Sequence, residues 1–219
     1  RVLMAMQIAR IAQEKDSPFG MALRVFPKLI YGSGHPYGIP FTGSGYADVV
    51  AKITRADLVK FHQTWFKPES ATMIVVGDTT VAEVKPKLEA LFRGWQGGKA
   101  PQKKIAPVPL AAKPVVYIMD KPDAPQSIVF CGAPAPSSAD PENVAIEMMN
   151  QILGGEFVSR INMNIREDKH WSYGAQSALI GAKGQRPFLV IAPVQSDKTK
   201  ETMVEIKGEL EGILGKKPI

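Results

Sequence analysis

The chain has 219 residues, of which 45% are hydrophobic and 22% charged, and its formal net charge is +6. This composition excludes an intrinsically disordered chain, a collagen and a coiled-coil rod. No run approaches 18 uncharged apolar residues, so no segment is predicted to span a bilayer. The densest basic group, at 99–104, lies in a proline-rich stretch without interleaved aromatic residues. That setting favours a solvated linker over a nucleic-acid site.

The first hundred residues are predicted to be mostly helical. Residues of the type that caps helices open three apolar-periodic stretches, two of them as capping boxes: Ser17, Thr54 with Asp57, and Thr80 with Glu83. The glycine- and proline-rich residues 32–45 predict a loop, and the short apolar run 71–77 predicts a strand. Because an apolar helical pattern is already under way at Val2 without an N-cap, we expect this chain to be a piece of a longer protein.

The pattern changes after a predicted linker at 99–114. Strands are predicted at 115–119, 127–132, 172–182 and 187–194, and helices at 140–153, 156–169 and 197–214. Strands and helices do not alternate strictly. The predicted fold class is therefore α+β, with antiparallel sheets and helices packed on one face, rather than a doubly wound parallel sheet.

Self-contained catalytic motifs are absent from the sequence. The three histidines, His35, His62 and His170, lie far apart, and neither HExxH nor HxxEH occurs. The phosphate-loop pattern GxxxxGK[ST] and the serine-hydrolase pattern GxSxG are missing too. The lone Cys131 has apolar neighbours, which indicates an inert buried thiol and leaves the redox compartment open. We therefore predict no metal site in this chain.

Residues 154–174 combine a helix with chemically useful side chains. On the predicted helix an apolar stripe faces the core: Phe157, Val158, Ile161 and Ile165. Ser159, Asn162 and Arg166 fall on another face, and Tyr173 opens the next strand. A guanidinium and a phenol meeting at this corner could donate hydrogen bonds to a carbonyl oxygen that gains negative charge. The alternative is that Arg166 is an exposed helix charge and Tyr173 an aromatic residue at the rim of the core.

This segment resembles a motif of the pitrilysin/insulinase family of zinc peptidases, written roughly LGG-x-F-x-S-R-L-x3-LRE-x4-YG. The matching residues are Leu153, Gly154, Gly155, Phe157, Ser159, Arg160, Ile161, Ile165, Arg166, Glu167, Tyr173 and Gly174. Residues 16–18, 31–40, 53–58 and 68–77 resemble the later part of a repeat in the same family. The resemblance covers nearly the whole chain in order.

The resemblance implies two partial metallopeptidase-like repeats. Residues 1–98 correspond to the rear half of one repeat, without its zinc motif, and residues 115–219 to the front half of the next. The third zinc ligand of active members would fall near Ala9 or Arg10, and neither side chain binds zinc. Zinc is then expected in a different part of the complete enzyme, on a catalytic half or partner subunit.

The resemblance also implies roles for individual residues. Tyr173 would donate to the oxyanion formed when a zinc-bound water attacks an amide, and Arg166 would anchor the substrate backbone or hold Tyr173 in place. Gly154, Gly155 and Asn162 are expected to contact substrate, which such enzymes bind as an added strand at a sheet edge. That mode favours peptides or unfolded polypeptides.

Two functions stay open at this point. One is the substrate-closing part of a zinc endopeptidase, inactive alone, and the other is a non-catalytic structural or partner subunit of the same family. Neither requires nucleic acid or a transmembrane segment. If the source is bacterial, the periplasm or cell envelope is the expected location.

Overall fold

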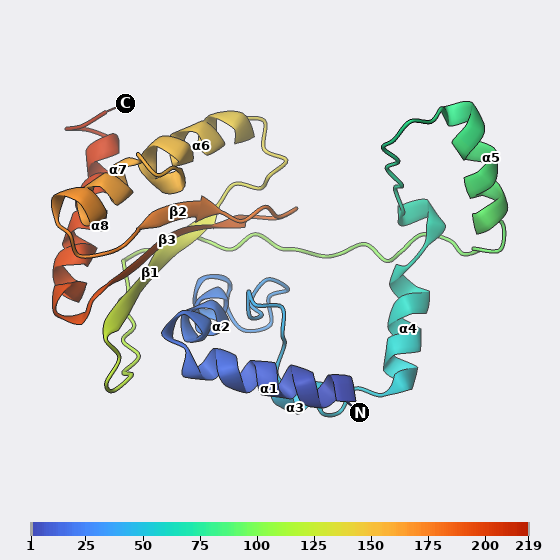
Figure 1. The fold of residues 1–219 in the computed structure, drawn as a ribbon, viewed down its shortest axis with the longest axis horizontal. Helices are drawn as coiled ribbons and strands as arrows, with labels where there is room; N and C mark the ends of the chain where they lie inside the picture. The colour runs from blue at the N-terminus through green and yellow to red at the C-terminus, as the bar shows by residue number, and fades with distance from the viewer. Residues whose placement is uncertain (1, 219) are drawn as a thin grey trace. The chain divides into compact units, whose positions relative to one another are not determined.

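A computed structural model describes residues 2–218. The chain forms two compact units, one of Arg1–Ala47 with Ile105–Ile219 and one of Asp48–Lys104. The helices and strands of each unit are labelled in Figure 1. Among the described residues, no helix combines the length and apolar character needed to cross a membrane.

Helices dominate the structure. The α-helices are α1 (Val2–Asp16), α2 (Pro18–Tyr31), α3 (Ala47–Val50), α4 (Arg55–Trp65), α5 (Val81–Phe92), α6 (Asn143–Asn150), α7 (Arg160–Asn162) and α8 (Thr199–Ile213). Two short π-helices, η2 (Gln151–Gly155) and η3 (Met163–Asp168), flank α7. The 3₁₀ turns are η1 (Pro68–Ser70) and η4 (Ser196–Lys198). The predicted helix starts are confirmed, since Ser17, Thr54 and Thr80 each accept a hydrogen bond from a first-turn backbone amide.

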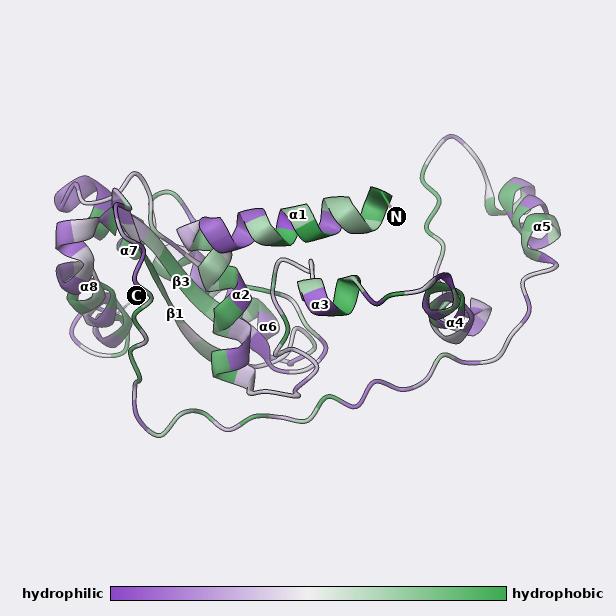
Figure 2. Ribbon diagram, turned by 90° about the horizontal axis from the view of Figure 1, so that it is seen from below, coloured by the Kyte–Doolittle hydropathy of each residue, from purple (hydrophilic) through white to green (hydrophobic). Residues whose placement is uncertain are grey.

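The larger unit contains a three-stranded antiparallel sheet in the order β1–β3–β2. Its strands are β1 (Gln126–Ala135), β2 (Gln176–Leu179) and β3 (Arg186–Gln195). The central strand β3 is the most deeply buried and is nearly continuous in apolar residues, green in Figure 2, as expected for a strand covered on both faces. The predicted α+β class with an antiparallel sheet is confirmed.

The core lies between one face of the sheet and the helices that come after β1 in the chain. Its fully buried members come from β1, β3, the segment 153–165, Ala175 and α8: Val129, Leu153, Ile161, Ile165, Ala175, Val190, Ala192, Val194 and Ile206. The next residue of β1, Phe130, points the opposite way and meets Phe26 of α2 with ring centroids 4.8 Å apart. The helices after β1 thus cover one face, and α2 adds a contact on the other.

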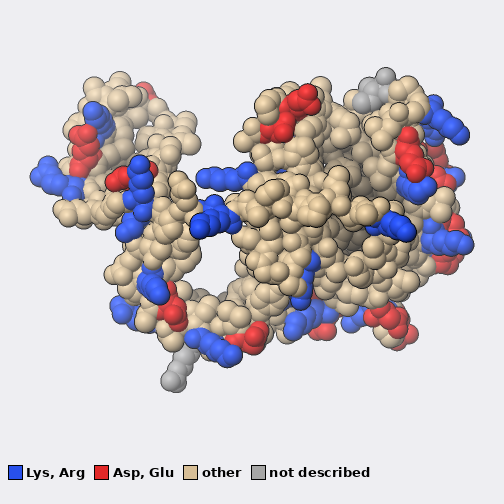
Figure 3. Space-filling model, turned by 180° about the vertical axis from the view of Figure 1, so that it is seen from behind, with Lys and Arg blue, Asp and Glu red and all other residues tan. Residues whose placement is uncertain are grey.

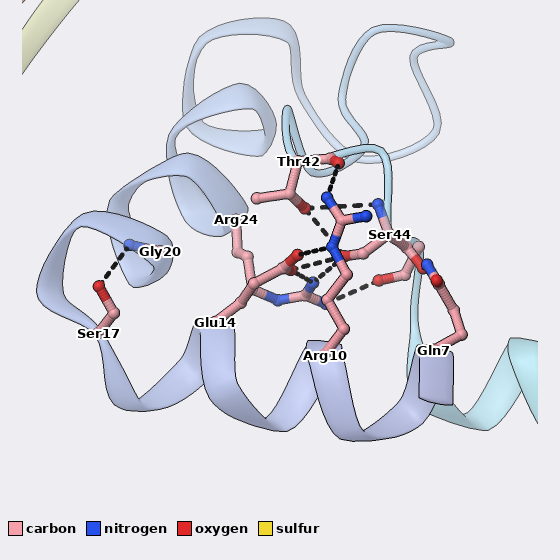
Figure 4. Close-up of polar contacts among 9 residues, drawn as sticks. Gln7, Arg10, Glu14, Ser17, Gly20, Arg24, Thr42 and Ser44 are labelled. Carbon is pink, nitrogen blue, oxygen red and sulfur yellow. Dashed lines mark hydrogen bonds and ion pairs between the residues drawn. The ribbon is translucent and has the colours of Figure 1, made fainter. Parts of the chain in front are cut away.

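A polar network joins α1, α2 and the loop that follows (Figure 4). The Glu14 carboxylate accepts from Arg24 Nη1 at 2.7 Å, from the Ser44 hydroxyl at 2.6 Å and from Arg10 Nε at 3.2 Å. Burial raises the pKa of Glu14, but hydrogen bonds from Ser44 and Arg24 outweigh it and hold the pKa below its ordinary value. Elsewhere the charges are dispersed, and Figure 3 shows Lys and Arg interspersed with Asp and Glu.

Two predicted strands are wrong. Residues 71–77 and 115–119 form no strand pairing, and their apolar side chains are exposed, among them Ile74 (84%), Val76 (92%) and Ile118 (89%). The apolar pattern indicates a preference for extended backbone. A strand also needs a neighbouring strand whose backbone groups hydrogen-bond with its own. No such neighbour exists for either run within the described residues.

Candidate functional site

The candidate site lies in the segment between α6 and β2, which contains one turn before α7 and another between η3 and β2. The predicted helix at 156–169 is partly wrong, because residues 156–159 form a turn in which the Ser159 amide donates to the Glu156 carbonyl at 3.0 Å. Helix α7 begins only at Arg160, after an extended Ser159, and continues directly into η3. Local π-helical geometry is frequent at functional sites.

This late start changes which side chains are buried. Ile161 and Ile165 are in the core as predicted, but Phe157 and Val158 are 62% and 77% exposed, since they precede the helix. Ser159 and Asn162, expected on a separate polar face, are buried instead. The apolar stripe inferred from helical spacing therefore fails where the backbone is not helical.

Tyr173 is presented to solvent by a well-anchored turn. Its side chain is 94% exposed, and no hydrogen bond to its hydroxyl occurs within residues 2–218. The Ser172 hydroxyl accepts from the Gly174 amide at 3.0 Å and lies within hydrogen-bond distance of the carbonyls of Gly174 and Pro193, to either of which its single proton can be donated. The contact with Pro193 ties the turn to the end of β3. An aromatic at the rim of the core would pack against it, and Tyr173 does not. Its phenol is free to bind a ligand.

Arg166 lies in η3 with its guanidinium over an aromatic ring. The guanidinium carbon is 4.4 Å from the centroid of the Phe157 ring, within the range of a cation–π contact. Arg166 Nη1 is 3.3 Å from the Glu167 carboxylate but makes no hydrogen bond of good geometry. Arg166 is thus oriented by Phe157, its Nη1 is buried without a hydrogen-bond partner, and no hydrogen bond joins it to Tyr173 within residues 2–218. Phe157 is the residue that sequence reasoning missed, because the helical pattern assigned it to the core.

Asn162 is 4% exposed, and its amide is occupied by backbone groups. Its Nδ2 donates to the Phe157 carbonyl at 2.6 Å, and its Oδ1 accepts from the Ala175 amide at 3.0 Å. These bonds leave Asn162 poorly placed for direct contact with a ligand, in contrast to Tyr173.

Gly154 and Gly155 lie where η2 approaches β2. A Cβ atom on Gly154 would sit 2.6 Å from the Ser177 backbone nitrogen, and one on Gly155 would sit 2.8 Å from the Gln151 side chain. Real Cβ atoms essentially never come this close, so only glycine fits at Gly154 without a backbone shift. Close packing within the chain therefore accounts for Gly154.

The possible metal ligands and the single cysteine are the remaining candidates for chemistry in this chain. Within residues 2–218 no group of three or more His, Cys, Asp or Glu side chains is arranged to hold a metal ion. Near the position that the resemblance assigns to a zinc ligand, Arg10 instead pairs with Glu14. Burial raises the pKa of Cys131 to about 11, which keeps it a thiol at neutral pH.

Comparison with known proteins identifies the family. Residues 52–218 match the family model described as the peptidase M16 inactive domain. An uncharacterized zinc protease of Mycobacterium leprae is 30% identical over 177 residues, covering 78% of this chain and 38% of that protein. Zinc protease PqqE of Helicobacter pylori is 25% identical over 182 residues, covering 81% and 40%.

A solved structure shows the same fold. The crystal structure of a peptidase M16 inactive domain from Pseudomonas fluorescens superposes with a TM-score of 0.89 at 22% identity, over 99% of this chain and 52% of that one. The chain spans about two fifths of the length of the curated relatives above. These matches confirm the resemblance seen in the sequence: the chain belongs to the family of the peptidase M16 inactive domain.

Proposed function

We propose that this chain is the substrate-closing part of a zinc-dependent endopeptidase that hydrolyses peptides or unfolded polypeptides. In this proposal the chain supplies contacts to the substrate and to the oxyanion, and the zinc is held by another part of the protein or by a partner subunit. Membership of the family and relatives named zinc proteases support the reaction class. The observation that carries the role of this part is the exposed, unpaired phenol of Tyr173 following the oriented Arg166.

The chemistry assigned to the two side chains follows from their donor groups. A phenol is protonated at neutral pH and donates one hydrogen bond, which suits an oxygen that becomes negative as an amide carbonyl is attacked. A guanidinium presents several donors in a fixed plane and suits carbonyl groups of a bound backbone. Tyr173 is therefore the proposed oxyanion donor, and Arg166 the proposed substrate anchor.

Zinc would polarise the scissile carbonyl and activate water. The described residues do not fit a zinc site, since they hold no suitable ligand cluster. What this chain does is bind and orient. An extended peptide adding to a sheet edge fits the unpaired edge of β2, which begins three residues after Tyr173.

The test is Tyr173→Phe in the full-length protein, assayed with a fluorogenic peptide. Loss of one oxyanion donor typically lowers the rate by roughly 10²–10³, so kcat should fall by that factor. The thermal unfolding midpoint should stay unchanged, because the hydroxyl makes no hydrogen bond within residues 2–218. Tyr117→Phe, which removes another exposed phenol, is the matched control and should retain full activity. An unchanged kcat in Tyr173→Phe would remove Tyr173 from the reaction.

A non-catalytic structural or partner subunit is the second candidate. The observation that favours it is the lack of a metal-ligand cluster in the described residues, together with the match to an inactive domain. Peptide hydrolysis that is abolished by a chelator and restored by zinc, measured on the full-length protein with any partner subunit, supports the protease. Absence of turnover from every such assembly supports the structural role.

A further inference from the structure

We infer that Asn162 is a positioning residue: its buried amide joins the segment that carries Phe157 to the segment that carries Tyr173. Its effect on catalysis rests on the function proposed above, whereas its bridging role does not. Sequence reasoning placed Asn162 among the residues that touch substrate, and the contacts of its side chain point to a different task.

Both ends of the Asn162 amide are used, and each end holds a different strip of backbone. Nδ2 donates to the carbonyl of Phe157 at 2.6 Å, in the turn before α7. Oδ1 accepts from the amide of Ala175 at 3.0 Å, just before β2. A Cβ on Gly174 would also lie 3.8 Å from Oδ1, so the end of the turn, at 174–175, runs past this side chain.

Each strip of backbone carries one half of the candidate site. The ring of Phe157 lies under the guanidinium of Arg166, and Ala175 follows Tyr173 by two residues. Asn162 itself is one helical turn before Arg166. The Asn162 side chain therefore connects the backbone of Phe157, whose ring lies under Arg166, with the turn that presents Tyr173. Asn162 itself belongs to the helical segment that carries Arg166.

Burial makes this connection hard to replace. The Asn162 side chain is almost inaccessible to solvent, so water cannot easily take over its bonds to Phe157 and Ala175. Removing the amide leaves the buried Ala175 N–H and the part-buried Phe157 carbonyl without this partner, which favours local rearrangement of both strips. The turn keeps its Ser172 anchor to β3 but loses its link to α7. Misplacement of a reacting group by about 1 Å costs roughly 10²-fold in rate.

The experiment combines hydrogen exchange with a double-mutant cycle in the full-length protein. In Asn162→Ala, exchange at the Ala175 amide should accelerate roughly five- to tenfold, because that N–H loses its acceptor. With a fluorogenic peptide, kcat should fall roughly 10- to 100-fold with a smaller change in KM. In a Tyr173→Phe background the same substitution should lower kcat by a clearly smaller factor, since one of the two groups that it positions is already gone and only the effect through Phe157 and Arg166 is left.

Asn164→Ala is the matched control. Asn164 lies on the same helical segment, and its amide donates to Glu205 and Glu209 rather than to either site strip. Exchange at Ala175 should be unchanged in this variant, and any effect on kcat should be additive with Tyr173→Phe. A purely structural role for Asn162 predicts the same additivity for Asn162→Ala.

A second variant covers the case in which Asn162→Ala does not fold. Asn162→Asp has the same size and keeps the acceptor for the Ala175 amide, but it removes the donor to Phe157. Ala175 should then remain slow to exchange while kcat still falls. Unchanged exchange at Ala175 in Asn162→Ala overturns the inference whatever the kinetics show. Accelerated exchange together with full activity of Tyr173→Phe supports the bridge and overturns the proposed function instead.

Discussion

Buried polar side chains are concentrated along the segment that carries the candidate site. Asn150, Asn162 and Ser177 are nearly inaccessible, and the Ser177 hydroxyl donates to Asn150 Oδ1 at 2.7 Å while Asn162 bonds to backbone on both sides. Burying a polar group costs free energy unless the group is hydrogen-bonded, and these three side chains are. This region is therefore fixed by specific bonds as well as by apolar packing, and substitutions here should affect placement as much as stability.

Gly154→Ala is predicted to destabilise the fold. The added methyl would fall on the Ser177 backbone, which cannot move without disturbing β2, and overpacking of this kind costs about 1–3 kcal/mol. Thermal or urea unfolding measures the loss. Gly208→Ala, in the exposed interior of α8 with open space around it, is the control and should instead stabilise by about 0.5–1 kcal/mol. Equal effects of the two substitutions would contradict the close-packing explanation of Gly154.

The lowered pKa of Glu209 predicts that the free energy of unfolding decreases in acid. Burial raises its pKa, but hydrogen bonds from Asn164 and Arg160 and the charges of Arg160 and Lys217 outweigh it and lower the pKa below 4.5. A carboxyl whose pKa is lower in the folded state contributes stability above the unfolded pKa, and this contribution disappears as pH falls through the folded pKa.

Urea unfolding between pH 7 and pH 3 tests this expectation. The free energy of unfolding should decrease below about pH 4.5, and Glu209→Gln should be less stable than the parent at pH 7 with a smaller decrease toward acid. Glu211→Gln is the control, because its pair with Lys207 is solvent-exposed and worth about 0.5 kcal/mol or less. A parent and a Glu209→Gln variant with parallel pH profiles would exclude Glu209 as a source of the acid sensitivity.

At the scale of elements, two apolar runs have the composition of a strand but no neighbouring strand to hydrogen-bond with among the described residues. Residues 71–77 and 115–119 have the composition of strands, yet among the described residues they find no pairing partner and expose their side chains. Extended apolar segments with free backbone groups are templates for pairing with another chain. We expect these two runs to be the most aggregation-prone surfaces of the isolated chain.

Lysine substitutions in these runs are predicted to improve solubility. The double variant Ile74→Lys with Ile118→Lys should reduce concentration-dependent light scattering and the fluorescence of a hydrophobic dye in the isolated chain, because both side chains are exposed. Helical content by circular dichroism should not change. The control is Lys60→Gln in the exposed part of α4, which changes charge without touching either run. If the control changes scattering as much as the double variant, the apolar runs are not responsible.

Local rules were most successful where a single residue decides the backbone. Thr54, with Asp57 three residues later, predicted a helix start that the structure confirms with both capping bonds. The apolar runs of β1 and β3 were also identified, whereas 71–77 was not a strand because pairing depends on residues distant in the sequence. At the site, helical periodicity predicts a buried Phe157, but residues 156–159 form a turn and leave its side chain exposed. The bridge made by Asn162 joins residues 5 and 13 positions away across non-helical backbone, which no spacing rule anticipates.

At the scale of the whole molecule, the relatives are much longer than this chain, which corresponds to about two fifths of them. The division into a rear half-repeat at 1–98, a linker at 99–114 and a front half-repeat at 115–219 stays a prediction. This division predicts that each half-repeat needs further strands to complete a sheet. The apolar runs 71–77 and 115–119, which have no strand partner among the described residues, agree with that prediction. Under the proposed function, zinc and the attacking water would be held by another part of the protein or by a partner subunit.

The isolated chain is therefore predicted to bind no stoichiometric zinc with high affinity and to cleave no peptide. Catalytic zinc requires about three clustered protein ligands, and the described residues offer no such cluster. Metal analysis after dialysis against zinc, together with a fluorogenic peptide assay, provides the measurement, with the full-length protein assayed in parallel as the positive control. Chelator-sensitive turnover by the chain alone would contradict the assignment of zinc to another part. Turnover that appears only when a separately produced zinc-binding half is added would instead show that the two parts form the site jointly, because neither the metal nor the phenol is then sufficient without the other.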